Sequence, residues 1–360
     1  MTPLSLYDLS LDELTERLAS LGEPAYRARQ IWRWAYRRFA RSYDEMTDLP
    51  AALRVRLLEE LPLTPVEETG TLRSADGQTR KSLLRLADGE LIEAVLMLYD
   101  PRSDSRGRAT ACLSTQAGCA MGCVFCATGQ AGFRRNLSTG EIVAQAVTLA
   151  RHLRDEEGRR LTNVVFMGMG EPLANYDATM RAVRILNARE GFGIAARHIT
   201  ISTVGLVTGI RKLAEERLQV GLAVSLHAPD DALRQRLIPT QRKPLAELLD
   251  AVRSYIEKTG RRVTFEYVLI DGVNDGAEHA RALGRLLRGL LCHVNLIPVN
   301  PTGAAFRRPS RARVLAFQRI VQEAGVPCTV RVEKGVEIAA ACGQLRGQHV
   351  ERAAARVGGA

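Results

Sequence analysis

Three cysteines stand close together in the chain, at positions Cys119, Cys123 and Cys126, with the spacing C-x3-C-x2-C. Four thiolates complete an iron–sulfur cluster or a structural zinc site, whereas three leave one metal corner without a protein ligand. An iron at that open corner can bind a chelating small molecule, and the amino and carboxylate groups of an amino acid form such a chelate. The alternative is a structural zinc site that is completed by a ligand from a distant part of the chain. It is disfavoured because the chain has no second C-x2-C pair.

Composition narrows the class of protein. The 360 residues are 46% hydrophobic, which is enough for one large domain with an appendage or for two domains. Seven cysteines are an odd number in a chain without an export signal, so metal binding or thiol chemistry is favoured over a disulfide framework. No apolar run approaches ~18 residues, so we expect a cytoplasmic protein without membrane contact. The net charge of +10 favours a polyanionic partner, although an arginine-rich background explains it equally well.

The first hundred residues predict two small units. Ser10 and Glu13 form a capping box, and helices are expected to about residue 21, over 24–41 and over 51–60. We assign residues 1–65 to a helical N-terminal domain with a possible RNA contact. Two β runs at 81–86 and 91–98 then predict a hairpin linker over residues 66–104.

The second predicted helix carries a basic stripe. Four arginines recur at every fourth position, and aromatic residues lie on neighbouring positions. The set is Arg29, Arg33, Arg37 and Arg41 with Trp32, Tyr36 and Phe39. Such a surface can grip phosphates and stack on bases. Equally, the aromatic residues can be the packed face of the helix and the arginines its solvated face.

From residue 105 to 345 the pattern alternates between β runs and helices. The predicted strands are 111–115, 163–168, 198–203, 220–226, 263–270, 293–299 and 328–332. Alternation of this kind predicts a parallel sheet, either doubly wound or a full or partial TIM-like barrel. In either form functional groups gather at the carboxyl ends of the strands. The Ala- and Gly-rich residues 346–360 are expected to be a flexible tail.

The unusual residues follow these predicted strands. The cysteine loop comes after the first strand, Gly168-Met-Gly-Glu-Pro172 ends the second, and Ser202, Ser225-Leu-His227 and Asn300 end later ones. The Gly168 motif lacks the third glycine of a dinucleotide loop. We therefore expect its glycines to let the backbone approach a ligand, and Glu171 to accept a hydrogen bond from a ligand ammonium.

Together these motifs resemble the radical S-adenosylmethionine (SAM) superfamily and, more narrowly, the adenine-C2 RNA methyltransferases of the RlmN type with their Cfr-type C8 relatives. The residues that carry the resemblance are Cys112, Gln116-Ala-Gly-Cys119, Phe133-Arg-Arg-Asn136, Gly168-Met-Gly-Glu-Pro-Leu173, Ser225-Leu-His227 and Ala340-Ala-Cys-Gly-Gln344. The resemblance implies an α/β fold with a partial (βα)6 barrel and a 4Fe–4S cluster on Cys119, Cys123 and Cys126. The residues that it implies for SAM are Gly170, Glu171, Ser202, Ser225, Leu226, His227 and Asn300.

The resemblance also implies a reaction that uses two equivalents of SAM. Adenine C2 is an electron-poor carbon, so direct methyl transfer from a sulfonium is blocked. One SAM methylates Cys342, and a second yields a radical that takes hydrogen from the new methyl group. The resulting carbon radical adds to C2, and the loss of one electron leaves the RNA covalently joined to Cys342. Cys112 then attacks the Cys342 sulfur, which releases the methylated RNA and leaves a disulfide bond. Glu93 holds the position of the acceptor of the ring proton, and Cys112 is the alternative base.

The substrates implied are adenosine in 23S rRNA, at the peptidyl transferase centre, and in tRNA just 3′ of the anticodon. A flavodoxin-like reductant and a monomeric enzyme are expected. Methylation at C8 is the nearest alternative. An alternative of another class is a nucleic-acid-binding protein with a structural zinc or an electron-transfer cluster. Cys292 and Cys328 lie at strand starts and are assigned to core packing.

Overall fold

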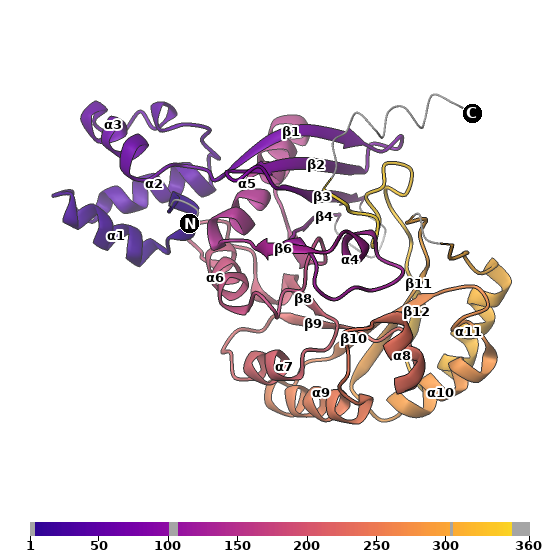
Figure 1. Ribbon diagram of the computed structural model, residues 1–360. Helices are drawn as coiled ribbons and strands as arrows, with labels where there is room; N and C mark the ends of the chain where they lie inside the picture. Colours follow the sequence, from indigo (N-terminus) through magenta and orange to yellow (C-terminus); the bar gives the residue numbers. More distant parts are fainter. Residues whose placement is uncertain (1–3, 101–106, 303–304, 348–360) are drawn as a thin grey trace.

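The computed structural model describes residues 4–100, 107–302 and 305–347. A cluster of short helices lies at one side of the molecule, and a single large sheet with covering helices forms the rest (Figure 1). The order of the strands in that sheet is β1-β2-β3-β4-β7-β8-β9-β10-β11-β12. No helix among the described residues is long and apolar enough to cross a bilayer.

The N-terminal helices are α1 (Leu11–Ser20), α2 (Tyr26–Tyr36) and α3 (Ala51–Glu60). The capping box is present, since Ser10 Oγ accepts from the Glu13 amide at 3.2 Å and Glu13 Oε2 accepts from the Ser10 amide at 2.7 Å. Helix α2 ends at residue 36 rather than 41. The chain turns at Phe39, whose φ of 51° lies in the left-handed region and cannot continue a helix.

The basic stripe of α2 is the solvated face of a packed helix. Trp32, Tyr36 and Phe39 are all buried. Two of the arginines pair with acids, Arg33 with Asp48 at 3.1 Å and Arg41 with Asp155 at 3.0 Å. The interpretation of these three aromatic residues as a stacking surface is therefore wrong, because their rings contribute to the core.

The expected hairpin consists of β2 (Thr79–Leu86) and β3 (Leu91–Tyr99), and a further strand, β1 (Val66–Arg73), precedes it. Strand β1 escaped prediction because a bulge between Glu68 and Gly70 interrupts its alternation. Strand β3 pairs antiparallel with β4 (Arg108–Cys112). The region between the helices and the barrel is thus an extension of the main sheet rather than a separate linker.

Seven strands form the parallel part of the sheet. After β4 these are β7 (Asn163–Phe166), β8 (Ile199–Thr203), β9 (Gly221–Ser225), β10 (Val263–Leu269), β11 (Cys292–Pro298) and β12 (Cys328–Val330). The strands follow one another in chain order without the reversal of a doubly wound sheet. The partial barrel is therefore confirmed, and the doubly wound alternative is wrong.

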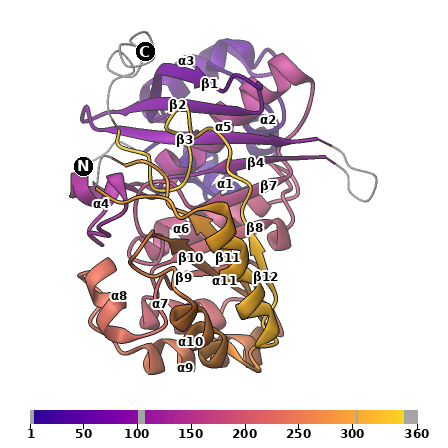
Figure 2. The same ribbon diagram turned by 90° about the vertical axis from the view of Figure 1, so that its right-hand side faces the viewer.

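Helices connect consecutive parallel strands and cover the outside of the sheet (Figure 2). They are α5 (Thr139–Glu157), α6 (Tyr176–Asn187), α7 (Val207–Ala214), α8 (Asp231–Leu237), α9 (Leu245–Thr259), α10 (Ala277–Leu287) and α11 (Arg311–Glu323). The predicted capping box at Ser138 and Glu141 opens α5. Asp8 of the N-terminal helical region accepts the Gly140 amide at 2.6 Å, which fastens that region to the same helix end. Of the expected tail, residues 348–360 lie outside the described part of the chain.

Candidate active site

A cavity of about 180 Å3 opens at the carboxyl ends of the parallel strands. It brings together predicted site residues from seven separate segments of the chain. Those that line it are Cys112, Cys119, Cys123, Cys126, Gly170, Glu171, Ser202, Ser225, His227, Asn300 and Cys342. Two predicted residues do not line it, Leu226 and Glu93, and both are buried.

The cluster loop, residues 119–132, is closed by a small two-stranded sheet of its own. Strands β5 (Gln116–Gly118) and β6 (Phe133–Asn136) pair antiparallel, and the Cys119 amide donates to the Gly132 carbonyl at 2.9 Å. Gly118 has a φ of 73°, and a Cβ there would lie 1.9 Å from the Gly132 oxygen. The short helix α4 (Ala127–Ala131) begins directly after Cys126. The ends of the loop therefore need glycine, and the loop has one compact shape.

The three cysteines of this loop have the chemistry of metal ligands. Burial raises the pKa of Cys119 to about 12 and that of Cys123 well above its usual value. Such thiols stay protonated until a metal replaces the proton. No group of three or more His, Cys, Asp or Glu side chains in the described ranges could hold a single metal ion. In a 4Fe–4S cluster the three thiolates bind three different irons, so they need not converge on one point. These residues fit a cluster, and the zinc alternative gains no support.

Glu171 and Gly170 form the wall opposite the loop. Glu171 is buried, and desolvation raises its pKa to about 7. Its carboxylate oxygens accept the backbone amides of Val204 at 2.8 Å and Leu173 at 3.1 Å, which leaves each oxygen one further lone pair for a ligand. Gly170 has a φ of 101°, and a Cβ there would lie 2.6 Å from the side chain of Gln116. A substituted residue could not keep this backbone against the cluster loop.

His227 lies behind the cluster loop in a strained conformation. Its φ is 61°, its Nδ1 accepts the Val268 amide at 3.0 Å, and its ring meets Phe125 edge to face at 4.9 Å. Burial lowers the pKa of His227 to about 3. The imidazole is therefore neutral at neutral pH and can donate a proton only from Nε2.

Asn300 connects the cavity with the C-terminal loop. Its Nδ2 donates to the Cys342 carbonyl at 3.1 Å, while its buried Oδ1 has no partner in the structure. A buried oxygen without a donor is costly, and a ligand amino or hydroxyl group can satisfy it. This orphaned atom is an observation in favour of a polar ligand at the position where SAM is expected.

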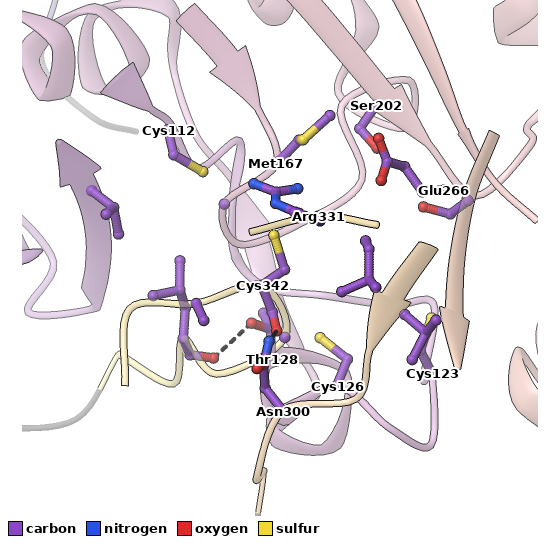
Figure 3. A pocket seen from close by; sticks show the side chains of 18 of the residues that line it. Cys112, Cys123, Cys126, Thr128, Met167, Ser202, Glu266, Asn300, Arg331 and Cys342 are labelled. Atoms are coloured by element: carbon purple, nitrogen blue, oxygen red, sulfur yellow. Dashed lines mark hydrogen bonds between the residues drawn. The ribbon is translucent and has the colours of Figure 1, made fainter. Parts of the chain in front are cut away.

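Cys112 and Cys342 are 230 positions apart in the sequence and line the same cavity. Between the two lies Arg331, close to the sulfur of Cys342 in Figure 3. Burial, and then the facing Cys342, raise the pKa of Cys112 to about 12, which the Arg331 charge opposes. The same thiol, Cys342, is the main cause of a raised pKa at Arg331. All seven cysteines are unpaired, so the disulfide bond expected between Cys112 and Cys342 is absent here.

The Cys342 loop, residues 335–346, is held by partners far away in the chain. Thr128 Oγ1 donates to the Leu345 carbonyl at 2.7 Å, and the Ala127 amide donates to the Gly343 carbonyl at 2.7 Å. Glu93 Oε2 accepts the Arg346 amide at 2.8 Å, and Glu93 Oε1 pairs with Lys81 Nζ at 3.0 Å. The predicted proton acceptor thus lies directly behind the Cys342 loop rather than on the cavity wall.

Sequence reasoning missed some residues of the site. Thr128 follows the last cluster cysteine, and Arg331 follows the last strand, so their positions alone could have drawn attention to them. Glu266, a buried carboxylate on β10 that lines the cavity, belongs to no motif. Arg135, which belongs to the motif Phe133-Arg-Arg-Asn136, makes two 2.8 Å bonds to Glu141 and ties β6 to α5.

Comparisons with known proteins agree with this geometry. Residues 113–283 match the family model of the Radical SAM superfamily, and residues 4–62 match that of the ribosomal RNA large subunit methyltransferase N-terminal domain. The chain is similar to a probable dual-specificity RNA methyltransferase RlmN of Chloroflexus aurantiacus, with 56% identity over 96% of this chain and 93% of the relative.

Two further matches cover almost the whole chain. Ribosomal RNA large subunit methyltransferase N of Nitrosopumilus maritimus is 51% identical over 95% of this chain and 98% of its own length. The crystal structure of a radical SAM methyltransferase from Sphaerobacter thermophilus superimposes with a TM-score of 0.93 at 57% identity, over 96% of this chain and 100% of that one. The chain therefore belongs to the RlmN-type RNA methyltransferases of the radical SAM superfamily, a family that uses a 4Fe–4S cluster and SAM.

Proposed function

We propose that this enzyme methylates C2 of adenosine in 23S rRNA, at the peptidyl transferase centre, and in tRNA just 3′ of the anticodon. Two equivalents of SAM are consumed per turnover. The observation that carries the proposal is the meeting of Cys112 and Cys342 in the cavity that also holds the three cluster cysteines. A radical source alone requires only the cluster loop. Two additional thiols facing each other supply a methyl carrier and a group that releases the product.

Each group has a defined task. Cys119, Cys123 and Cys126 hold the cluster. When bound, the cluster and SAM supply a methyl group and a hydrogen-abstracting radical. Cys342 carries the methyl carbon to adenine, and Cys112 attacks the Cys342 sulfur to free the RNA. Atoms balance in this last step: the sulfur–carbon bond breaks, a disulfide forms, and the carbon leaves with the electron pair and takes up a proton.

The remaining cavity residues hold SAM in this proposal. Gly170 permits close backbone approach, Glu171 accepts from the ligand ammonium, and Asn300 Oδ1 accepts a further hydrogen bond. Ser202, Ser225, Leu226 and His227 complete the set on β8 and β9 and in the turn that follows β9. Glu93 is proposed as the acceptor of the ring proton, with Cys112 as the alternative.

Partners and organisation follow the same proposal. A flavodoxin-like protein supplies electrons, and the enzyme acts as a cytoplasmic monomer. Residues 1–65 form the helical domain that contributes to RNA binding, residues 66–104 the region that precedes the barrel, and residues 105–345 the radical SAM core. The exposed arginines of α2 and the net charge of +10 are suited to a phosphate backbone.

The test is an anaerobic turnover assay with the Cys112→Ala enzyme. We expect 5′-deoxyadenosine to form and RNA to remain covalently attached to Cys342, because the release step lacks its thiol. Cys342→Ala is expected to give no attached RNA at all. Mass mapping of RNA modified by the unaltered enzyme must place the methyl group on C2. A methyl group on C8, or a Cys112→Ala enzyme that traps no RNA, would contradict the proposal.

A further inference from the structure

Lys81 is a buried lysine in β2 that touches two parts of the reaction machinery at once. Its Nζ lies 3.0 Å from Glu93 Oε1 and donates to the Ala339 carbonyl at 3.2 Å. Lys81 and Glu93 lie on the same face of the β2–β3 pair, because Lys81 stands opposite Val95 and Glu93 opposite Leu83. A buried ammonium is unfavourable without such partners. The position of Lys81 is thus defined by the carboxylate and by the Cys342 loop.

The two contacts of this ion pair flank Cys342. Ala339 precedes Cys342 by three residues and is held by Lys81, whereas Arg346 follows it by four residues and donates its amide to Glu93 Oε2 at 2.8 Å. In Figure 2 the last part of the chain runs from β12 up to β2 and β3. The ion pair therefore fastens both ends of the Cys342 loop to the sheet.

The backbone at Ala339 gives a second, independent observation. Its φ of 51° lies in the left-handed region, which alanine disfavours, and such a conformation persists only where surrounding contacts impose it. The Ala339 amide donates to the Val336 carbonyl at 3.1 Å, and the Ala339 carbonyl accepts from Lys81. Lys81 is the side chain that fixes this carbonyl, and thereby the direction in which the chain continues to Cys342.

We propose that Lys81 is a positioning residue that orients the Glu93 carboxylate and holds the Cys342 loop, so that thiol and proton acceptor reach the target adenine in one fixed relation. This inference rests on the proposed function. In the step concerned, the C2 proton of the covalently attached adenine passes to a Glu93 oxygen, and the electron pair of the C–H bond stays in the ring. The ammonium offsets the carboxylate charge until the proton arrives.

The experiment compares Lys81→Met and Lys81→Arg in the full-length, cluster-loaded enzyme, with Lys243→Met as the matched control. Lys243 is an exposed lysine that pairs with Glu247 on the surface at 3.1 Å. Enzyme with methylated Cys342 is mixed with RNA whose target adenosine carries hydrogen or deuterium at C2. The lifetime of the covalent RNA adduct is measured on denaturing gels, and amide exchange of residues 340–345 is measured without RNA.

For Lys81→Met we expect an adduct lifetime at least about tenfold longer than in the unaltered enzyme. Deuterium should extend it about twofold or more, because proton removal has become the slow step. Amide exchange in the Cys342 loop should be faster. Lys81→Arg, which keeps a charged donor, should recover most of the rate, and Lys243→Met should behave as the unaltered enzyme does.

An unchanged adduct lifetime in Lys81→Met, or an equal defect in Lys81→Arg, would overturn the inference. If Lys81→Met does not fold, Lys81→Gln takes its place, because its amide still donates but carries no charge. If the unaltered enzyme forms neither adduct nor methyladenosine, the proposed function fails. In that case, faster amide exchange of the Cys342 loop in Lys81→Met would still support the inference that Lys81 holds this loop. Unchanged amide exchange would refute it.

Discussion

The cluster loop and the Cys342 loop meet at one cavity but are held in opposite ways. The cluster loop is closed by neighbours in sequence, such as the bonds from Cys119 to Gly132 and from Gln116 to Asn136. The Cys342 loop is held by Lys81 and Thr128, which are more than 200 positions away. A metal-binding loop formed from local contacts can be complete before the barrel is. The Cys342 loop has some local bonds, such as that from the Ala339 amide to the Val336 carbonyl, but its attachment to the cavity comes from distant elements, so it reaches its position only once the sheet is assembled.

The Cys342 loop and the cluster loop also differ in the rigidity that their tasks require. The neutral hydrogen bonds that hold the Cys342 loop are worth about 1 kcal/mol net each, and those to the charged groups of Lys81 and Glu93 about 1.5–3 kcal/mol. In the proposed reaction, Cys342 has to approach SAM for methylation, adenine for addition and Cys112 for release. Several weak and separate contacts suit a loop that changes partners, whereas a cluster requires fixed ligands.

The largest effect is expected from Cys123→Ser. Loss of one of three thiolates should remove the iron and reduce 5′-deoxyadenosine formation by more than about 100-fold, because no other described cysteine lies in the cluster loop to replace it. Iron content and the yield of 5′-deoxyadenosine measure the change. Cys328→Ala is the control, since Cys328 is buried in the sheet away from the cavity, and it should keep its iron. Normal iron content in Cys123→Ser would show that the loop does not hold the cluster.

Gly118→Ala tests whether the cluster loop depends on its local closure. The new methyl group would meet the Gly132 carbonyl at 1.9 Å in a left-handed conformation, so we expect a loss of at least ~3 kcal/mol in stability and poor retention of iron. Gly122→Ala is the matched control. It shares the positive φ but meets nothing within 4 Å, so it should cost only ~1 kcal/mol. Thermal unfolding and iron retention after gel filtration separate the two, and equal behaviour would argue against the local closure.

Thr128→Val, a substitution within the cluster loop, should weaken the attachment of the Cys342 loop while leaving the three cluster cysteines in place. The substitution keeps the shape of the side chain and removes the 2.7 Å bond to the Leu345 carbonyl, which is worth ~1 kcal/mol. We expect about fivefold slower methylation of Cys342, followed by mass spectrometry, with unchanged iron content. A loss of iron of similar size would show that the two loops are not independent.

At neutral pH the smallest effect is expected from His227, because its contribution to stability changes only when the protein is acidified. His227 packs against Phe125 of the cluster loop, and its pKa is lowered by burial to about 3 from an ordinary 6.5. The unfolded chain takes up this proton near pH 6.5 and the folded chain does not. The contribution of His227 to stability is therefore complete above pH 6.5 and falls by up to about 1.4 kcal/mol per pH unit below it.

In His227→Gln, the free energy of unfolding should fall less between pH 7.5 and 5 than it does in the unaltered protein. It is measured by denaturant unfolding of the cluster-free protein. A control variant in which the exposed His198 is replaced should show the same pH dependence of the unfolding free energy as the unaltered protein. If His227→Gln unfolds with the same pH dependence, the imidazole is not buried in its neutral form. Acid should destabilise the packing of His227 against the cluster loop first. The Cys342 loop should be affected less, because His227 makes no described hydrogen bond to it.

Much of the fold followed from sequence patterns. The βα alternation predicted the parallel strands to within a few residues, and the capping boxes at Ser10 and Ser138 placed two helix starts correctly. Strand β1 and the early end of α2 were missed because a bulge at Gly70 and a left-handed Phe39 are local exceptions to periodicity. The helix face of Trp32 could not be assigned, since amphipathic spacing alone does not distinguish a packed aromatic face from a binding one.

The sequence by itself predicted the three cysteines proposed as cluster ligands, because their spacing within one short loop is a local property. The sequence also indicated which residues follow the parallel strands and therefore lie together at the carboxyl end of the barrel. Only the tertiary structure decided that Cys112 and Cys342 face each other beside Arg331, and that Glu93 lies behind the Cys342 loop in contact with Lys81. These relations join residues as much as 250 positions apart, and they depend on strand register and side-chain packing that no local pattern encodes.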